Sequence, residues 1–438
     1  MNQIKQHMKK KKLVIWCDFI APTGFGIVAK NLLEDLHEHY DVHIVAINYR
    51  GDEWYDTKKW FVYSTQQNDP LNIGTLYKVV AKLKPELILL FQDHFHISKE
   101  IVDLKKSSPK SKIITYFPVD SDYIGDHVKK IFECSNAVIT YTEYAIEVLK
   151  AKVPTYNKKI YKLYHGVNKD DFYELSDEEI LKLRTLAKLQ GKFILFNNNR
   201  FQPRKAVPLT IRAYSMFSKG YKVCKDCGNW YPIHLNKCDL NGCKNYELGG
   251  SAKDDTHLYL HMNDGDSMGP GPLNSLKSHF LMNGFKPEDY PSKIDFTKVD
   301  IYSGVIKEQS INEFYNIANV NITTTLGEGF GLNLIESMMV GTPSIAPNNS
   351  CIAEVLKGTG KLVNNVSMFG HPNDAAVQRP IVDIKEFVKA LEEYYTEWKA
   401  ANVEKIKYKD YIVTANWWYR WQDKKDKLLE IIKKVEGD

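Results

Sequence analysis

The stretch from Thr325 to Pro343 joins an apolar run to a helical pattern through closely spaced glycines. Glycines let a chain leave a strand and enter a helix through a tight turn. Three backbone N–H groups would then stand at the start of the helix, at Phe330, Gly331 and Leu332. Such groups have no partner within the helix and lie at the positive end of its dipole, so they bind phosphate groups. The stretch predicts a diphosphate site, with a tight connection that binds no ligand as the alternative.

Two carboxylates flank this turn. Glu328 precedes it, and Glu336 lies about a turn and a half into the helix. The two side chains would lie at different positions along the helix axis. One could therefore reach a sugar and the other a ribose. This arrangement favours a nucleotide that carries a sugar.

Arg200 and Lys205 lie in the segment that follows the apolar run from Phe193 to Phe196. Ligands of open α/β sheets bind at the carboxyl ends of the strands. Arginine can hold phosphate oxygens through two hydrogen bonds, and lysine adds a compact charge. The two side chains are therefore suited to neutralising a departing diphosphate, and a solvated loop is the alternative.

A second strand, glycine-rich turn and helix pattern opens the chain, with Gly24 and Gly26 in the turn. A backbone can approach a ligand closely at such positions. The third glycine of a dinucleotide fingerprint is missing, and no acidic partner for a ribose stands out. We therefore infer no NAD site.

Short apolar runs alternate with helical spacing along the whole chain, which indicates βα units and parallel sheets. In the first half the predicted strands are Leu13 to Cys17, Val42 to Ile47, Leu87 to Phe91, Ile113 to Phe117, Ala137 to Thr140 and Ile160 to Tyr164. In the second half they are Phe193 to Phe196, Thr256 to His261, Val299 to Tyr302, Val320 to Thr324 and Ser344 to Ala346. An amphipathic helix is predicted from Trp417 to Val435.

The length of 438 residues suits two α/β domains. We expect an N-terminal Rossmann-like domain over residues 1–170, completed by a C-terminal helix over residues 415–438, and a second Rossmann-like domain over residues 190–410. Residues 222–250 break the alternation and are expected to form an insertion in the second domain.

Together these motifs resemble the retaining glycosyltransferases of family 4, the group 1 glycosyltransferases. Their GT-B fold has two doubly wound domains that face a cleft. The resemblance covers most of the chain. The segments that carry it are Glu328 to Glu336, Asn199 to Lys205, Tyr116 to Asp120, His165 to Val167 and Ser303 to Ile306.

The resemblance implies roles for residues of the second domain. Arg200 and Lys205 would hold the donor diphosphate. Glu336 would hydrogen-bond the ribose, and Glu328 would contact the transferred sugar. The backbone facing the base would be that of Gly304, Val305 and Ile306.

For the first domain, the resemblance implies that Gly24 to Gly26 approach the phosphates and the acceptor. Asp120 and His94 would touch the sugar, and the C-terminal helix would cross back onto this domain.

The implied activity is transfer of a hexose from a UDP- or GDP-sugar to a glycan, lipid or protein acceptor, with retention of anomeric configuration. Positive charge directed at the leaving group is the main catalytic effect expected. Because arginine and lysine supply that charge, we expect no catalytic divalent metal. Asp264 and Asp266 are accordingly interpreted as loop residues.

Four cysteines in the expected insertion, Cys224, Cys227, Cys238 and Cys243, have the spacing of a zinc ribbon. In a reducing compartment such a cluster favours a closed tetrahedral zinc site, with disulfides or free thiols as alternatives. His234 is a possible replacement for one of them. A zinc ion would stabilise the insertion, since a short segment with little core gains folding energy from metal binding.

The composition excludes several classes of protein. The net charge is +5, and the most obvious basic run, Lys9 to Lys12, lies at the N-terminus, so we expect no nucleic acid partner. No apolar stretch approaches the roughly 18 residues of a membrane-spanning helix. The scattered thiols of Cys17, Cys134 and Cys351 fit a cytoplasmic protein, and contact with a membrane surface through the basic run stays open.

Two other functions stay open. The first is another enzyme on the same fold, such as a phosphorylase or a nucleotide-sugar epimerase. A phosphorylase would need a cofactor lysine site, which the sequence does not show. The second is a non-catalytic module that binds a nucleotide-sugar or RNA and uses the cysteine insertion for contact. The presence of Arg200, Lys205, Glu328 and Glu336 argues against it.

Overall fold

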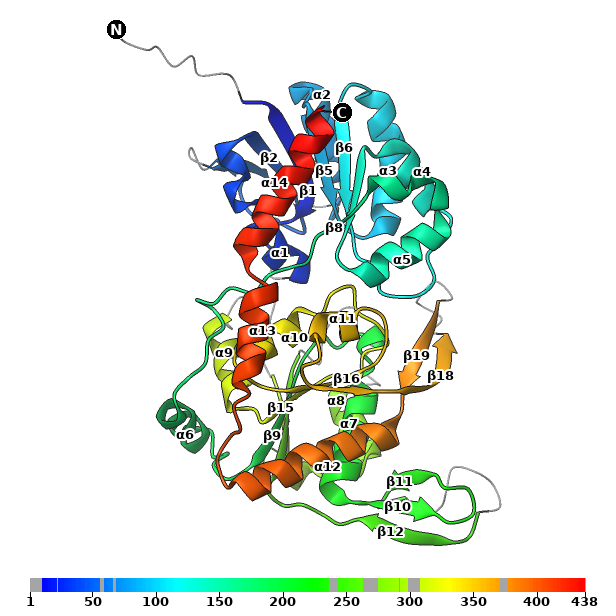
Figure 1. Cartoon of the computed structure of the whole chain (residues 1–438), viewed down its shortest axis with the longest axis vertical. Coiled ribbons are helices and arrows are strands. Elements are labelled where there is room, and N and C mark those ends of the chain that lie inside the picture. Colours follow the sequence, from blue (N-terminus) through cyan, green and yellow to red (C-terminus); the bar gives the residue numbers. More distant parts are fainter. Residues whose placement is uncertain are drawn as a thin grey trace. The chain divides into compact units, whose positions relative to one another are not determined.

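The chain forms two compact units in the computed structural model (Figure 1). The structure describes residues 10–21, 23–55, 59–65, 68–235, 243–262, 275–290, 292–297, 308–370 and 377–437. Unit 1 contains the residues up to Gly166 and those from Tyr419 onward, and unit 2 runs from Val167 to Trp418. Both units are α/β structures built on parallel sheets, as the alternation of apolar runs predicts.

Unit 1 is built on an eight-stranded sheet in the order β3-β4-β2-β1-β5-β6-β7-β8. The strands are β1 (Lys12–Asp18), β2 (Asp41–Ile47), β3 (Trp54–Tyr55), β4 (Trp60–Tyr63), β5 (Leu87–Phe91), β6 (Lys112–Tyr116), β7 (Ala137–Thr140) and β8 (Ile160–Lys162). All neighbours pair in parallel except β3 and β4, which are antiparallel. The six strands predicted for this half are present, and β3 and β4 are additional strands that were not predicted.

Helices cover both faces of this sheet. They are α1 (Gly24–Leu33), α2 (Ile73–Leu83), α3 (His94–Ser107), α4 (Val128–Cys134), α5 (Glu143–Lys152) and α14 (Trp421–Gly437), with 3-10 turns at Glu34–Glu38 and Pro154–Lys159. Val14 and Trp16 of β1 belong to the core formed with α2, α3, α4 and α5. Ile15 between them is equally buried. Because successive strand residues face opposite ways, Ile15 faces the layer of α1 and α14.

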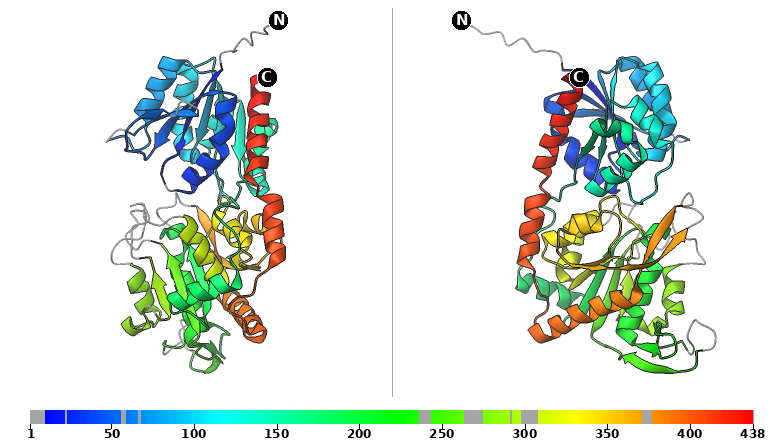
Figure 2. Two further views of the ribbon diagram at one scale, coloured as in Figure 1. Left: turned by 90° about the vertical axis from the view of Figure 1, so that its left-hand side faces the viewer. Right: turned by 45° about the vertical axis from the view of Figure 1, so that its right-hand side comes forward.

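The C-terminal helix α14 runs along the sheet of unit 1 (Figures 1 and 2). It buries an apolar stripe, Leu428, Ile431, Ile432 and Val435. Each such side chain stabilises the fold by roughly 2 kcal/mol. Two ion pairs add to this attachment, since Lys425 Nζ lies 2.9 Å from a Glu34 oxygen and Lys11 Nζ lies 2.9 Å from a Glu436 oxygen.

Unit 2 is built on a six-stranded sheet in the order β14-β13-β9-β15-β16-β17, and all neighbours pair in parallel. Its strands are β9 (Phe193–Asn198), β13 (Thr256–His261), β14 (Ile294–Phe296), β15 (Val320–Ile322), β16 (Ser344–Pro347) and β17 (Lys361–Val363). Four of these were predicted. The strand predicted over Val299–Tyr302 lies outside the described residues.

The helices of unit 2 are α6 (Asp177–Leu186), α7 (Val207–Lys219), α8 (Leu276–Met282), α9 (Glu308–Ile317), α10 (Leu332–Met339), α11 (Ile352–Leu356), α12 (Ile384–Ala401) and α13 (Lys409–Trp418), with 3-10 turns at Pro203–Lys205 and Pro287–Asp289. Leu195 of β9 packs in the core with α7 and α12. The next residue, Phe196, stacks on Phe314 and meets Tyr315 edge-on, both on α9. The central strand is therefore buried on both faces, which explains its continuous apolar run.

Two antiparallel additions extend unit 2. One is a three-stranded sheet of β10 (Tyr221–Cys224), β11 (Trp230–Pro232) and β12 (Tyr246–Gly250), within the predicted insertion. The other is the ribbon of β18 (Asn365–Gly370) and β19 (Gln378–Val382), which stands out from the unit in Figures 1 and 2. No ribbon was predicted there, because β18 is largely exposed and has no apolar run.

The single helix predicted from Trp417 to Val435 is wrong at its start. The structure has two helices, α13 ending at Trp418 and α14 beginning at Trp421. Tyr419 between them is buried, with its ring 6.1 Å from that of Tyr164. Since α13 contacts α10 of unit 2 and α14 contacts α1 of unit 1, the break lies where the chain passes between the units. Within the described ranges, no helix has the length and apolar character needed to span a bilayer.

Candidate active site

The central strands of unit 2 bring two predicted segments to one sheet edge. β9 pairs with β13 on one side and with β15 on the other, so the order of strands reverses around it. Ligands of open α/β sheets bind outside the carboxyl ends of strands at such a point. The segments following β9 and β15 also bond to each other, since Leu326 N donates to Arg204 O at 2.8 Å and Thr324 Oγ1 donates to Ala206 O at 2.9 Å.

Glu328 makes two charged contacts at this edge. Lys205 Nζ donates to its Oε1 at 2.6 Å, and Arg204 Nη1 donates to its Oε2 at 3.3 Å. The Glu328 side chain is buried, which by itself would raise its pKa, but the charges of Lys205 and Arg204 outweigh burial and lower that pKa to about 2. Glu328 is therefore a carboxylate throughout the neutral range.

The backbone around Glu328 is also held in place. Its N–H donates to Ser350 Oγ at 2.9 Å, and the Cys351 thiol donates to its carbonyl oxygen at 3.1 Å. The Arg204 guanidinium donates to the carbonyl of Gly327 as well as to the carboxylate. Sequence motifs assigned no role to Arg204, Ser350 or Cys351, because nothing in their spacing shows that the loop after β16 lies against the loop after β15.

Helix α10 begins at the predicted turn. Gly331 precedes it with φ +89°, a left-handed conformation that favours glycine, and no side chain caps the helix. The first N–H groups of a helix have no partner within it. The structure thus places Phe330, Gly331 and Leu332 at an uncapped helix start directly after Glu328.

Glu336 is the second carboxylate of the site and projects from α10. The Tyr315 hydroxyl of α9 donates to its Oε2 at 2.9 Å, and Asn198 Nδ2 of β9 lies 3.5 Å from the same oxygen. Burial and the nearby Glu336 charge raise the pKa of Tyr315, so the phenol keeps its proton and acts as a donor. Tyr315 and Asn198 were not predicted, because helix α9 carries no motif and Asn198 looks like part of a strand.

The other residues predicted for the donor site in unit 2 are Arg200 and the segment from Gly304 to Ile306. Arg200 is half-buried just beyond β9, where its carbonyl accepts from Gln202 N at 2.8 Å in a tight turn. The segment predicted to face the base, Gly304, Val305 and Ile306, lies outside the described residues.

In unit 1, Gly26 is explained by close backbone packing. The side chain of Thr23 caps α1 by accepting from Gly26 N at 3.1 Å. A Cβ at Gly26 would stand 2.0 Å from Ala21 O, which no real side chain tolerates. Gly24, at the first position of α1, is exposed.

His94 begins α3, beyond the carboxyl end of β5. Its Nδ1 lies 2.7 Å from His127 Nε2, so one ring donates to the other. Burial and then the proximity of His127 lower the pKa of His94 to about 4, although the Asp120 charge acts in the opposite direction. His94 is therefore neutral at pH 7, and Asp120, which follows β6, lies close enough to influence it.

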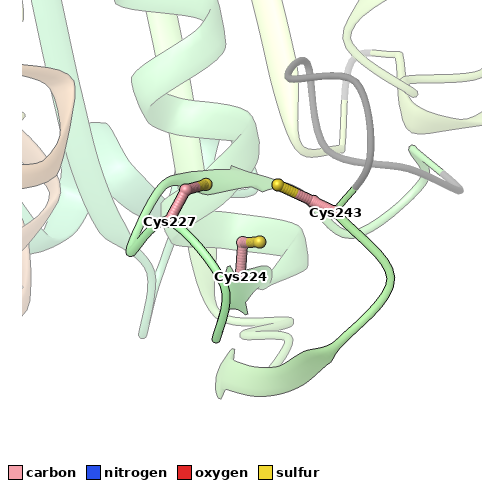
Figure 3. Close-up of side chains that lie close together, drawn as sticks. All are labelled: Cys224, Cys227 and Cys243. Carbon is pink, nitrogen blue, oxygen red and sulfur yellow. The ribbon is translucent and has the colours of Figure 1, made fainter.

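Three of the four clustered cysteines come together in unit 2 (Figure 3). The sulfur atoms of Cys224, Cys227 and Cys243 all lie within 4.8 Å of one another. Cys238 lies outside the described residues. His234 points elsewhere, with Nε2 3.2 Å from Met282 O.

Comparison with known proteins agrees with this architecture. The family model described as glycosyl transferases group 1 matches residues 297–403, which include Glu328 and Glu336. No curated protein sequence matches the chain.

Several solved structures share the fold over nearly the whole chain. The Anabaena protein HepE in complex with UDP and glucose has a TM-score of 0.65 at 12% identity, covering 97% of this chain and 100% of its own. Sucrose-phosphate synthase from Thermosynechococcus elongatus has a TM-score of 0.68 at 14% identity, covering 98% and 100%. The catalytic domain of starch synthase IV from Arabidopsis thaliana, bound to ADP and acarbose, has a TM-score of 0.62 at 13% identity, covering 98% and 100%. The fold is thus GT-B, as the sequence motifs predict.

Proposed function

We propose that this protein is a group 1 glycosyltransferase that transfers a hexose from a UDP- or GDP-sugar to a glycan, lipid or protein acceptor, with retention of anomeric configuration. The observation that carries the proposal is the meeting of Arg204, Lys205 and Glu328 beside the uncapped start of α10, with Glu336 on the same helix. Cations, a helix N-terminus and two carboxylates at one sheet edge suit a sugar linked to a nucleoside diphosphate.

The cations would act on the leaving group. When the glycosidic bond to the diphosphate breaks, negative charge develops on the phosphate oxygens, and fixed positive charge lowers the energy of that state. We assign this role to Arg200 and Lys205. Arg204 is assigned the same role because it contacts Glu328. Because protein side chains neutralise the diphosphate, we expect transfer to proceed without a divalent metal.

Glu328 would act as an anion. Lys205 and Arg204 lower its pKa to about 2, which favours the role of an anion over that of a general acid at neutral pH. It can accept a hydrogen bond from a hydroxyl of the transferred sugar. It can also stabilise the positive charge that develops at the anomeric carbon as the donor bond breaks.

Glu336 would bind the ribose. Tyr315 and Asn198 hydrogen-bond to its Oε2 and so fix the orientation of the carboxylate. A ribose offers hydroxyl donors, and hydrogen bonds to an ionised acceptor are stronger than those between neutral groups. The base would lie against Gly304 to Ile306, and retention is inferred from the likeness of the segment from Glu328 to Glu336 to retaining enzymes.

The proposal also assigns roles to residues of unit 1 and a cellular compartment to the protein. Gly24 to Gly26, His94 and Asp120 are assigned to the acceptor and the sugar. The thiols of Cys17, Cys134 and Cys351 are scattered along the chain, which fits a reducing cytoplasm. The zinc ion predicted for the insertion would take no part in transfer, since its cysteines lie on other elements than Glu328 and Lys205.

A ligand screen tests this function. Purified protein is heated with UDP, GDP, ADP and their common sugars, and the melting temperature is recorded. A ligand at about ten times its Kd stabilises the folded state by roughly 1.4 kcal/mol, which raises the melting temperature by a few degrees. We expect one nucleotide and its sugar to do so.

Three variants test whether the ligand binds at the candidate site. Glu336→Gln and Lys205→Ala should lose the ligand shift, whereas Lys182→Ala, which changes an exposed lysine on α6, should keep it. If no nucleotide stabilises the wild type, the donor assignment is wrong. If a nucleotide binds but no transfer occurs with any acceptor, a binding module on the same scaffold becomes the better account.

A further inference from the structure

The cysteine cluster is built on two turns of the β10–β12 sheet. Cys224 ends β10, Cys227 lies in the turn that follows, and Cys243 leads into β12. Figure 3 shows the three sulfur atoms directed toward a common point. The sheet lies at the end of unit 2 remote from α10 in every view of Figures 1 and 2, so the cluster is separate from the candidate active site.

The two turns are locked together by hydrogen bonds. Asp226 Oδ2 accepts from Lys244 N at 2.7 Å and from Asn245 N at 3.1 Å. Lys225 N in turn donates to Asn245 O at 3.0 Å. These bonds hold the turn carrying Cys227 against the turn carrying Cys243.

Donor groups surround the sulfur of Cys224. The backbone N–H groups of Cys227 and Asp226 and the thiols of Cys227 and Cys243 hydrogen-bond to it. Such donors orient a ligand sulfur, as the outer partners of metal ligands do.

One part of this sheet packs against the core of unit 2 through Tyr221, Val223 and Trp230, whereas its cysteine end has little apolar packing of its own. Its buried apolar cluster consists of Cys224 and Tyr231, with Leu235 and Cys243 partly buried beside them. Most of β12 is exposed. Small units with so little core depend on disulfides or metals for stability.

A disulfide explains the geometry poorly, because it would pair two of three neighbouring sulfurs and leave the third alone. Sulfurs bound to one zinc ion at about 2.3 Å in a tetrahedron stand roughly 3.8 Å apart. The separations here are at most 4.8 Å, so shifts of about 1 Å or less would complete the coordination.

We propose that Cys224, Cys227 and Cys243 bind one structural zinc ion that holds the β10–β12 sheet in its fold. Structural zinc sites are four-coordinate. Cys238, the fourth ligand predicted from the sequence, lies outside the described residues.

Metal analysis of the whole protein tests the proposal. Zinc and iron are measured by plasma mass spectrometry after purification without chelators. We expect about one zinc ion per chain, as for a single closed site. Cys227→Ser and Cys243→Ser should lower the zinc content severalfold, while Cys134→Ser, which changes a half-buried thiol in unit 1, should leave it unchanged.

A second measurement covers the case in which the variants do not fold. Native wild-type protein is titrated with a mercurial thiol reagent in the presence of a dye that reports released zinc. Zinc should appear as the insertion thiols react, and trypsin should then cut within residues 221–250 while the rest of unit 2 resists. Wild-type protein that contains no zinc, that contains iron in its place, or that releases zinc without thiol modification would overturn the proposal.

Discussion

Replacing Glu328 by glutamine removes one negative charge and keeps the shape of the side chain. In the wild type this charge is paired with Lys205 Nζ at 2.6 Å and with Arg204 Nη1 at 3.3 Å. Glutamine has one amide oxygen, so it can accept a hydrogen bond from one of the two cations and places its NH2 group beside the other. The variant therefore removes the charge together with one of the two hydrogen bonds.

The size of the effect follows from the pKa of Glu328. Burial would raise this pKa, but Lys205 and Arg204 lower it from 4.5 to about 2. A difference of about 2.5 units corresponds to about 3 kcal/mol of stability at neutral pH. Because the side chains of Lys205 and Arg204 are 14% and 26% exposed, solvent screens part of this energy, and we expect about 2 to 3 kcal/mol.

The dependence on pH has a definite sign. The folded-state pKa lies below the unfolded value, so the stabilisation is present above pH 4.5 and is lost as the pH falls toward 2. The wild type should exceed Glu328→Gln in stability at pH 7, and roughly half of that difference should be gone by about pH 3.

Urea unfolding at a series of pH values measures this difference. Glu178→Gln, which changes an exposed carboxylate on α6, is the matched control and should stay within about 0.5 kcal/mol of the wild type. A loss below about 1 kcal/mol at pH 7 in Glu328→Gln, or a difference that does not shrink between pH 5 and pH 3, would refute the electrostatic account.

Three further substitutions have expected outcomes. Tyr315→Phe removes the donor 2.9 Å from Glu336 and should raise the Kd of the nucleotide about fivefold in calorimetric titration, since a hydrogen bond contributes about 1 kcal/mol. Gly26→Ala places a Cβ 2.0 Å from Ala21 O and should lower the stability of unit 1 by about 2 kcal/mol in urea unfolding. Arg184→Met leaves the buried oxygens of Ile317 and Asn319 without the guanidinium that donates to them and should cost about 3 kcal/mol or more by the same measurement.

Each of these has a control at an exposed position. Tyr246→Phe changes an exposed tyrosine of β12, Gly24→Ala an exposed glycine at the start of α1, and Lys182→Met an exposed neighbour of Arg184. All three should behave like the wild type. If Tyr315→Phe binds nucleotide unchanged, or if the other two variants are no less stable than their controls, the contacts named here do not have the assigned effect.

The parallel strands were predictable because burial on both faces leaves a continuous apolar run, as in Leu87–Phe91. The antiparallel ribbon of β18 and β19 gave no such signal, since β18 is exposed along most of its length. The break at Tyr419 was also hidden. Periodicity continues through it, and only the separate attachment of α13 and α14 to different units ends one helix and starts the next.

The candidate site was predictable in its residue types and less so in its contacts. The strand order brings Lys205 and Glu328 together although 123 residues separate them. Spacing alone does not show that the carboxylate pairs with the lysine. Arg184 illustrates the same limit, because a charged residue on an amphipathic helix looks exposed, whereas its partners Ile317 and Glu404 lie 133 and 220 residues away.

Release of nucleoside diphosphate from labelled UDP- and GDP-hexoses, with water accepting the hexosyl group where no acceptor is added, tests the central claim most directly. The assay is run on the wild type, Lys205→Ala and the exposed-lysine control Lys182→Ala, with EDTA present throughout. We predict release from one donor by the wild type and the control, with a loss on the order of a hundredfold or more in Lys205→Ala. Equal release by all three proteins, or release that requires an added divalent metal, would contradict the assignment of the diphosphate to the cations beside Glu328.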